Sequence, residues 1–172
     1  NQEATVANLY QAMYDLLQVA EKGDRIFFYF SGHGDVEQQL TSGLGFLLAW
    51  NSPPNNYLNN AIRLEDLNHF AQTLSVNKEA NVIIIADACR SGKLAGDKVN
   101  GRRLLGDNLR KSTRGELRFA SCGPDQLAAE NQAWGGGRGV FSYYLLKGLQ
   151  EEAASLINAD AITGKSLFQY IS

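Results

Sequence analysis

Two short hydrophobic runs, each without interspersed polar residues, stand out in the chain. Residues 26–30 read IFFYF and residues 82–86 read VIIIA, and each run gives way abruptly to small and polar residues. Runs of this length, rich in aromatic and β-branched residues, are typical of strands buried on both faces, as in a parallel sheet covered by helices. The pattern therefore predicts an α/β fold with a mostly parallel central sheet.

Helical spacing surrounds the two runs. Apolar residues recur every three or four positions in a first helix, for which Thr5 is the expected N-cap, and the prolines at 53 and 54 interrupt the chain before the next helix. We expect His69, on that next helix, to be a surface or boundary residue rather than a catalytic one. The expected helices span residues 5–21, 62–74, 140–149 and 167–171, and further strands span residues 45–50 and 117–122.

Composition places the chain among ordinary soluble globular proteins. It has 172 residues, enough for one domain, with 44% hydrophobic and 20% charged residues. A net charge of -2 gives no sign of a nucleic acid or an anionic membrane as partner. These residues contain no apolar run of the roughly 20 residues that a membrane span needs, and no signal peptide is visible in them. Two cysteines do not make a disulfide framework, so we expect a cytoplasmic protein.

Each central strand delivers one reactive side chain at its carboxyl end. The first run leads into Ser31-Gly32-His33-Gly34, and the second into Asp87-Ala88-Cys89-Arg90-Ser91-Gly92. Since ligands bind at this edge of an open α/β sheet, His33 and Cys89 could meet there. A thiol beside an imidazole is the minimum for nucleophilic acyl transfer, with Cys89 as nucleophile and His33 as general acid and base. The alternatives are a buried structural cysteine and a turn histidine bonded to its own loop.

In this order, and each after a hydrophobic strand, the two motifs resemble the catalytic signature of caspase-like cysteine peptidases, in the metacaspase and bacterial caspase-like (orthocaspase) branch. The similarity runs through nearly the whole chain. It implies a three-layer caspase-like fold with helices on both sides of the sheet, and a peptidase catalytic domain over residues 1–172. Members of this family begin with a strand, a helix and a second strand before the helix that opens this chain. We therefore expect the N-terminal part of the domain to be missing from this sequence.

The resemblance also assigns roles around the dyad. The backbone amides of Gly34 and Cys89 are expected to form the oxyanion hole. True caspases carry glutamine where this chain has Asp87, whereas in metacaspases the matching aspartate and the serine that matches Ser31 help to bind an arginine or lysine before the cleaved bond. Asp87 lies two residues before the nucleophile, on the same side of an extended strand end. The expectation is cleavage after basic residues, and the alternative is a carboxylate that accepts backbone hydrogen bonds.

Residues 93–116 differ in composition from the rest of the chain, because they are rich in basic residues and in glycine. We expect a mobile surface loop, where nicking concentrates. An enzyme that cuts after arginine or lysine could process itself there, and the alternative is a solvated charged loop. Nucleic-acid binding is not expected, because no aromatic residues are interleaved for stacking. The candidate cleavage sites are Arg102, Arg103, Arg110 and Lys111.

Metal binding is the least supported expectation. Many metacaspases need calcium, and Glu65, Asp66 and Asp97 match acidic positions of that family. Asn51, however, stands where another aspartate is expected, and calcium prefers several charged oxygen ligands. The first expectation is therefore no cofactor, with calcium as the alternative.

Other chemistries of cysteine and phosphate do not fit. Ala95 occupies the position at which a cysteine phosphatase needs arginine, and Glu37 breaks the dinucleotide-binding fingerprint. We expect a cysteine endopeptidase of proteins or peptides in bacterial stress, cell-death or defence signalling, partnered by its own missing N-terminal segment or a sensor domain. The alternative is a catalytically silent caspase-like scaffold or protein-binding module. The presence of both His33 and Cys89 favours the peptidase.

Overall fold

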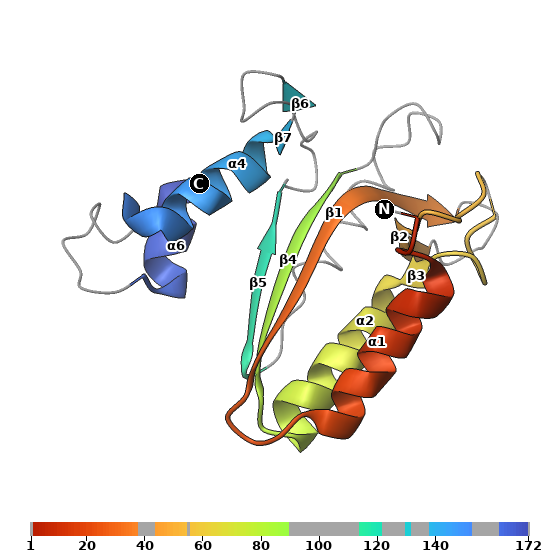
Figure 1. Ribbon diagram of the computed structural model, residues 1–172, viewed down its shortest axis with the longest axis horizontal. Coiled ribbons are helices and arrows are strands. Elements are labelled where there is room, and N and C mark those ends of the chain that lie inside the picture. Colours follow the sequence, from red (N-terminus) through yellow and green to blue (C-terminus); the bar gives the residue numbers. More distant parts are fainter. Residues whose placement is uncertain are drawn as a thin grey trace. The chain divides into compact units, whose positions relative to one another are not determined.

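The structure is a computed structural model that describes residues 2–37, 44–54, 56–89, 114–121, 130–131, 138–152 and 162–171. The chain divides into two compact units, Asn1–Leu127 and Ala128–Ser172 (Figure 1). The expectation that both work as one catalytic domain stays a prediction, and each unit is described by itself.

A mixed five-stranded sheet, in the order β3-β2-β1-β4-β5, forms the first unit. Its strands are β1 (Arg25–Glu37), β2 (Leu44–Leu48), β3 (Ile62–Arg63), β4 (Asn81–Cys89) and β5 (Glu116–Ala120). β4 runs parallel to both β1 and β5, whereas β2 is antiparallel to β1 and to β3. The α/β fold is thus confirmed. The sheet is mixed because the link from β1 to β2 is too short for the crossover that parallel strands require.

Helices α1 (Val6–Val19) and α2 (Leu64–Gln72) pack side by side on one face of this sheet (Figure 1), and α2 continues into the π-helical turn η1 (Thr73–Asn77). Thr5 caps α1 as predicted, its hydroxyl accepting a hydrogen bond from the backbone N–H of Asn8 at 3.3 Å. The two helices and the sheet share one hydrophobic core, because their apolar positions face one another. It includes Met13, Ile26, Leu67, Leu74, Val82 and Ile84.

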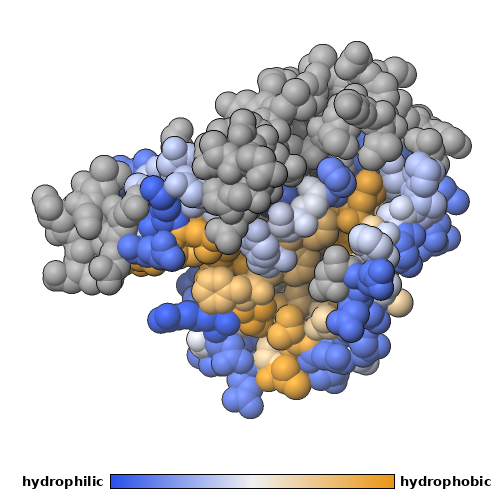
Figure 2. All heavy atoms as spheres, turned by 45° about the horizontal axis from the view of Figure 1, so that its top comes forward, coloured by the Kyte–Doolittle hydropathy of each residue, from blue (hydrophilic) through white to orange (hydrophobic). Residues whose placement is uncertain are grey.

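The expectation of strands buried on both faces is confirmed for β4, where Ile84 and Ile85 are 1% and 7% exposed, but it is wrong for β1, whose face away from the helices is exposed among the described residues. Phe27 and Tyr29 are 63% and 53% exposed. The described helices of this unit both cover the other face, and among the described strands only β4 pairs with residues 25–32. Hydrophobic atoms also reach the surface between hydrophilic margins in a space-filling view (Figure 2). An unbroken apolar run therefore does not reveal whether both of its faces are covered.

The expected surface loop ends earlier than residue 116. Glu116 opens β5, and its side chain is fully buried against Arg118, with the guanidinium 2.8 Å from the carboxylate. Ser75 also donates a hydrogen bond to Glu116, at 3.2 Å, and Arg118 donates one to Asn68. These partners come from α2 and η1, so this charged pair belongs to the sheet–helix interface.

The second unit holds a short antiparallel pair, β6 (Glu130–Asn131) and β7 (Arg138–Gly139), and the helices α4 (Val140–Lys147) and α6 (Gly164–Ile171). The π-helical turn η2 (Gly148–Glu152) extends α4. A side chain at Gly148 would lie 2.7 Å from a methyl carbon of Leu167, so this glycine allows η2 and α6 to approach closely. Among the helices that the structure describes, none has the length and apolarity needed to cross a membrane.

Candidate active site

The strand segments that carry the predicted dyad are neighbours in the sheet. The parallel register of β1 and β4 places Ser31 opposite Asp87, and His33 opposite Cys89. Neighbouring strands lie about 4.8 Å apart, and side chains alternate between the faces along each strand. Positions 31, 33, 87 and 89 therefore share one face of the sheet. The structure describes Cys89 by its backbone alone, so the register is the observation that pairs it with His33.

The hydrophobic runs create this arrangement through their two-residue period. Ile26 and Phe28 in β1, and Val82 and Ile84 in β4, pack into or against the core beneath α1 and α2. The alternate positions then face away from these helices. Because the motifs continue the same strands, their reactive residues fall on this second face.

The residues of this face differ in their access to water. Ser31 and His33 are exposed, so a substrate can reach the imidazole from solvent. Asp87 is only 8% exposed. A carboxylate withdrawn from water is stabilised by hydrogen bonds or by a positive charge. The site thus combines an accessible imidazole with a buried acid beside it.

At His33, β1 changes its pairing partner. Residues 25–33 pair with β4, and residues 33–37 pair with β2 on the other side. The hydrophobic pattern predicts that the strand ends at the histidine motif, but β1 continues to Glu37. It continues because the ladder with β2 supports the polar residues that follow. Gly34, the predicted oxyanion donor, is buried within this ladder opposite Leu47. Its role in catalysis stays a prediction.

Two buried carboxylates follow His33 along the same strand and were missed from the sequence. Asp35 and Glu37 are 1% and 7% exposed. The hydroxyl of Tyr57 donates a hydrogen bond to Asp35 at 3.0 Å, and the backbone N–H of Tyr57 donates one to Glu37 at 3.4 Å. Tyr57 lies in the segment that leads to β3, so this cluster anchors the strand end beyond the histidine. The alternation His33, Asp35, Glu37 was the sequence signal for it.

The acidic residues proposed for calcium have other roles in the described part of the chain. Asp66 accepts a hydrogen bond from the hydroxyl of Tyr10 at 2.6 Å, while Glu65 is exposed at the start of α2. The side chain of Asn51 accepts a hydrogen bond from the backbone N–H of Val6 at 3.0 Å, which ties it to the start of α1. No group of three or more metal-ligating side chains occurs among the described residues. Calcium binding stays a prediction.

Several predicted positions lie outside the described residues. They are the calcium candidate Asp97 and the candidate cleavage sites Arg102, Arg103, Arg110 and Lys111. His69 is described and exposed on α2, as expected for a surface residue.

Comparison with known proteins agrees with the geometry. A family model described as a caspase domain matches residues 1–166. A search of curated proteins found no match. The matched range includes both strand motifs, the whole first unit and residues 128–166 of the second unit.

Proposed function

Because the chain belongs to the caspase domain family, a family of cysteine peptidases, we propose that it is a cysteine endopeptidase that uses Cys89 as nucleophile and His33 as general acid and base. The observation that carries this proposal is the register of β1 and β4, which sets His33 opposite Cys89. The exposure of His33 supports it, since the imidazole must reach a bound peptide.

The reaction follows from these two groups. His33 takes the proton of the Cys89 thiol, the sulfur attacks the carbonyl carbon of the scissile bond, and His33 gives this proton to the leaving amine as the C–N bond breaks. Water then attacks the resulting thioester while His33 takes up a proton from it, and this proton passes to the departing sulfur, which restores the thiol. The backbone N–H groups of Gly34 and Cys89 serve as oxyanion donors, each worth about 2.7–4 kcal/mol in comparable sites.

Ser31 and Asp87 make basic residues the preferred side chains before the cleaved bond. They lie opposite each other in register, and each precedes a residue of the dyad by two positions on its strand. An arginine or lysine side chain would bring positive charge and hydrogen-bond donors to the carboxylate of Asp87, which is 8% exposed, and Ser31 adds an exposed hydroxyl. We assign to these two residues the recognition of arginine or lysine, as in the metacaspase and orthocaspase branch.

This specificity makes the protein a candidate substrate of itself. Arg102, Arg103, Arg110 and Lys111 follow the nucleophile in a basic, glycine-rich segment. Cleavage there, with calcium as an optional activator through Glu65, Asp66 and Asp97, fits a cytoplasmic role in bacterial stress, cell-death or defence signalling. The second candidate function is a silent scaffold or protein-binding module.

Hydrolysis of fluorogenic peptides tests the proposal. The peptides differ only in the residue before the bond (Arg, Lys, Asp or Ala), and each is tried with and without calcium. We expect cleavage after arginine and lysine by the wild type and by Cys122→Ala, the matched control at the second cysteine. Cys89→Ala should be inactive. Mass spectrometry of the incubated protein would locate any cuts in residues 93–116.

The other outcomes separate the parts of the proposal. Cleavage after aspartate alone would keep the dyad and reject the role of Asp87. Activity that survives Cys89→Ala would reject the nucleophile. No cleavage under any condition, together with an intact segment 93–116, would favour the scaffold.

A further inference from the structure

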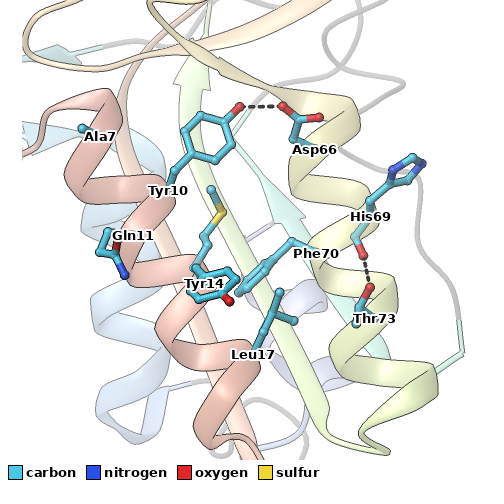
Figure 3. Close-up of a pocket in the computed structure, with 10 residues that line it drawn as sticks. Ala7, Tyr10, Gln11, Tyr14, Leu17, Asp66, His69, Phe70 and Thr73 are labelled. Atoms are coloured by element: carbon cyan, nitrogen blue, oxygen red, sulfur yellow. Dashed lines mark hydrogen bonds between the residues drawn. The ribbon is translucent and has the colours of Figure 1, made fainter.

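A groove of about 520 Å³ lies between α1 and α2, on the helical side of the first unit (Figure 3). Met13 and Phe70, which are 5% and 7% exposed, contribute buried apolar surface to it. Tyr10, Tyr14 and Leu17 line it from α1. Its volume falls within the range of roughly 300–1,000 Å³ that is usual for small-molecule sites. The groove is therefore large enough for a small organic ligand.

Asp66 is the one acidic residue among the groove's described lining residues, and no lysine or arginine is among them. One of its carboxylate oxygens accepts the hydrogen bond from Tyr10, and the other accepts none from the described residues. The nearest basic residue in the sequence, Arg63, donates to the backbone carbonyl of Leu58 and forms no ion pair with Asp66. Among the described residues, this oxygen thus has no cationic partner.

Tyr10 serves Asp66 as a hydrogen-bond donor at neutral pH. Burial, and then the hydrogen bond to Asp66, raise the pKa of Tyr10 to about 12, so Tyr10 stays a neutral donor near pH 7. His69 lines the groove as well, but its ring points away from α1 (Figure 3). The charge of the described lining therefore favours a positively charged ligand.

Aromatic rings complete the chemistry of the groove. Tyr10, Tyr14 and Phe70 each present a ring to it (Figure 3). Aromatic faces attract cations, and Met13 and Leu17 add flexible apolar contact for the body of a ligand. We propose that this groove binds a small primary amine with an apolar body, its ammonium group bonded to Asp66 and its body packed between α1 and α2. This proposal is independent of the chemistry of Cys89 and His33, since the groove lies on the other side of the sheet from positions 31 and 33, but it shares Asp66 with the proposed calcium candidates.

Titration of the purified protein with 4-phenylbutylamine, followed by amide NMR shifts, tests the proposal. The matched probe is 4-phenylbutanol, which has the same body and no charge. We expect saturable shifts in α1 and α2 with a Kd on the order of 1 mM, as for a ligand of about ten heavy atoms. The alcohol should bind about tenfold more weakly, because it lacks the charge-assisted hydrogen bond.

Two acids that are neighbours in sequence provide the matched variants. Asp66→Asn should reduce amine binding to the level of the alcohol, whereas Glu65→Gln, which removes the same charge at an exposed position outside the groove, should bind as the wild type does. Equal binding of amine and alcohol, an equal loss in both variants, or no saturable shift would overturn the proposal. If Asp66→Asn does not fold, Tyr14→Ala serves instead, since Tyr14 is 58% exposed and its removal should still weaken the amine.

A lysine-bearing peptide provides the third arm. Binding of this peptide at the groove without binding of the free amine would contradict a small-molecule site and indicate a protein partner. None of these measurements uses peptide hydrolysis, so a negative result here leaves the dyad untouched, and an inactive dyad leaves this result untouched.

Discussion

The two faces of the sheet in the first unit are made by the same strands, but their side chains differ in how far they are buried. On the helical face, Ile26, Val82 and Ile84 are 7%, 1% and 1% exposed. On the other face of β1, Phe27 and Tyr29 are 63% and 53% exposed, and the exposed Ser31 and His33 continue the same two-residue alternation. The first face is fixed by packing, whereas the second keeps Ser31 and His33 of β1 within reach of solvent, although Ile85 and Asp87 of β4 are buried on it. The comparison predicts that stability depends on the first face and chemistry on the second.

Replacement of His33 tests the chemical face, and it should give the largest effect. His33→Ala removes the proposed acid and base, so kcat/KM for an arginine peptide should fall by about 10²- to 10⁴-fold. Because the side chain is exposed, the free energy of unfolding should change by no more than about 0.5 kcal/mol. The control is His69→Ala, the other histidine, which is exposed on α2 and should retain full activity. Retained activity in His33→Ala would reject its role, and a comparable loss in both variants would not assign the acid and base to His33.

Replacement of Ile84 tests the packed face. Ile84→Ala leaves a cavity beneath α1 and α2 and should lower the free energy of unfolding by about 2–5 kcal/mol in a urea titration. Ile83→Ala is the matched control, since this neighbour on the other face is partly exposed and should cost less. The folded fraction of Ile84→Ala should keep the wild-type kcat/KM. Equal destabilisation by the two variants would show that both faces are packed alike.

The first helix and the pairing of the two central strands could be predicted from the sequence, because both depend on local patterns. The first helix, expected at residues 5–21, is observed at Val6–Val19, with Thr5 as its cap. The pairing of positions 33 and 89 in the register of β1 and β4 followed from two apolar runs and the rule that parallel strands share an edge. Both inferences need only a few adjacent residues, whose own preferences agree with the fold.

What the sequence did not reveal depends on partners distant along the chain. Asp35 is buried because Tyr57, beyond β2, donates to it, and Glu116 is buried because Arg118, Ser75 and the helices enclose it. Polar character alone predicts a surface for such residues. Phe27 shows the converse, since an apolar side chain does not reveal whether a helix will cover it. Burial is a property of the assembled unit rather than of the residue.

Removal of the Tyr57–Asp35 hydrogen bond tests whether the end of β1 beyond His33 contributes to stability alone or also to the positioning of His33. Tyr57→Phe removes one donor from a carboxylate that is 1% exposed, so the free energy of unfolding should fall by about 1–3 kcal/mol. Tyr14→Phe, at a 58% exposed position, should change it by less than about 0.5 kcal/mol. A drop in kcat/KM for the fully folded Tyr57→Phe protein would assign this cluster to positioning of His33. Unchanged kinetics would make it a structural anchor.

The smallest expected effect is the change in the free energy of unfolding that accompanies the titration of Tyr10, on the helical side. Its pKa rises from 10.0 to about 12 in the folded protein, chiefly through burial and then through the hydrogen bond to Asp66. Below pH 10 both the folded and the unfolded chain hold this proton. Between pH 10 and 12 the unfolded chain loses the proton first, so the contribution of Tyr10 to stability declines as the pH rises.

Urea titrations at pH 9 and pH 11 measure this decline, and Tyr10→Phe should show less of it than the wild type because it has no proton to lose at this position. Asp66→Asn should fall between the two, since the carboxylate is removed but the burial of Tyr10 stays. An equal decline in all three proteins would place the responsible group elsewhere. The titration should change the free energy of unfolding without altering kcat/KM measured on folded protein near neutral pH, because Tyr10 lies on the helical side and positions 31 and 33 face away from it.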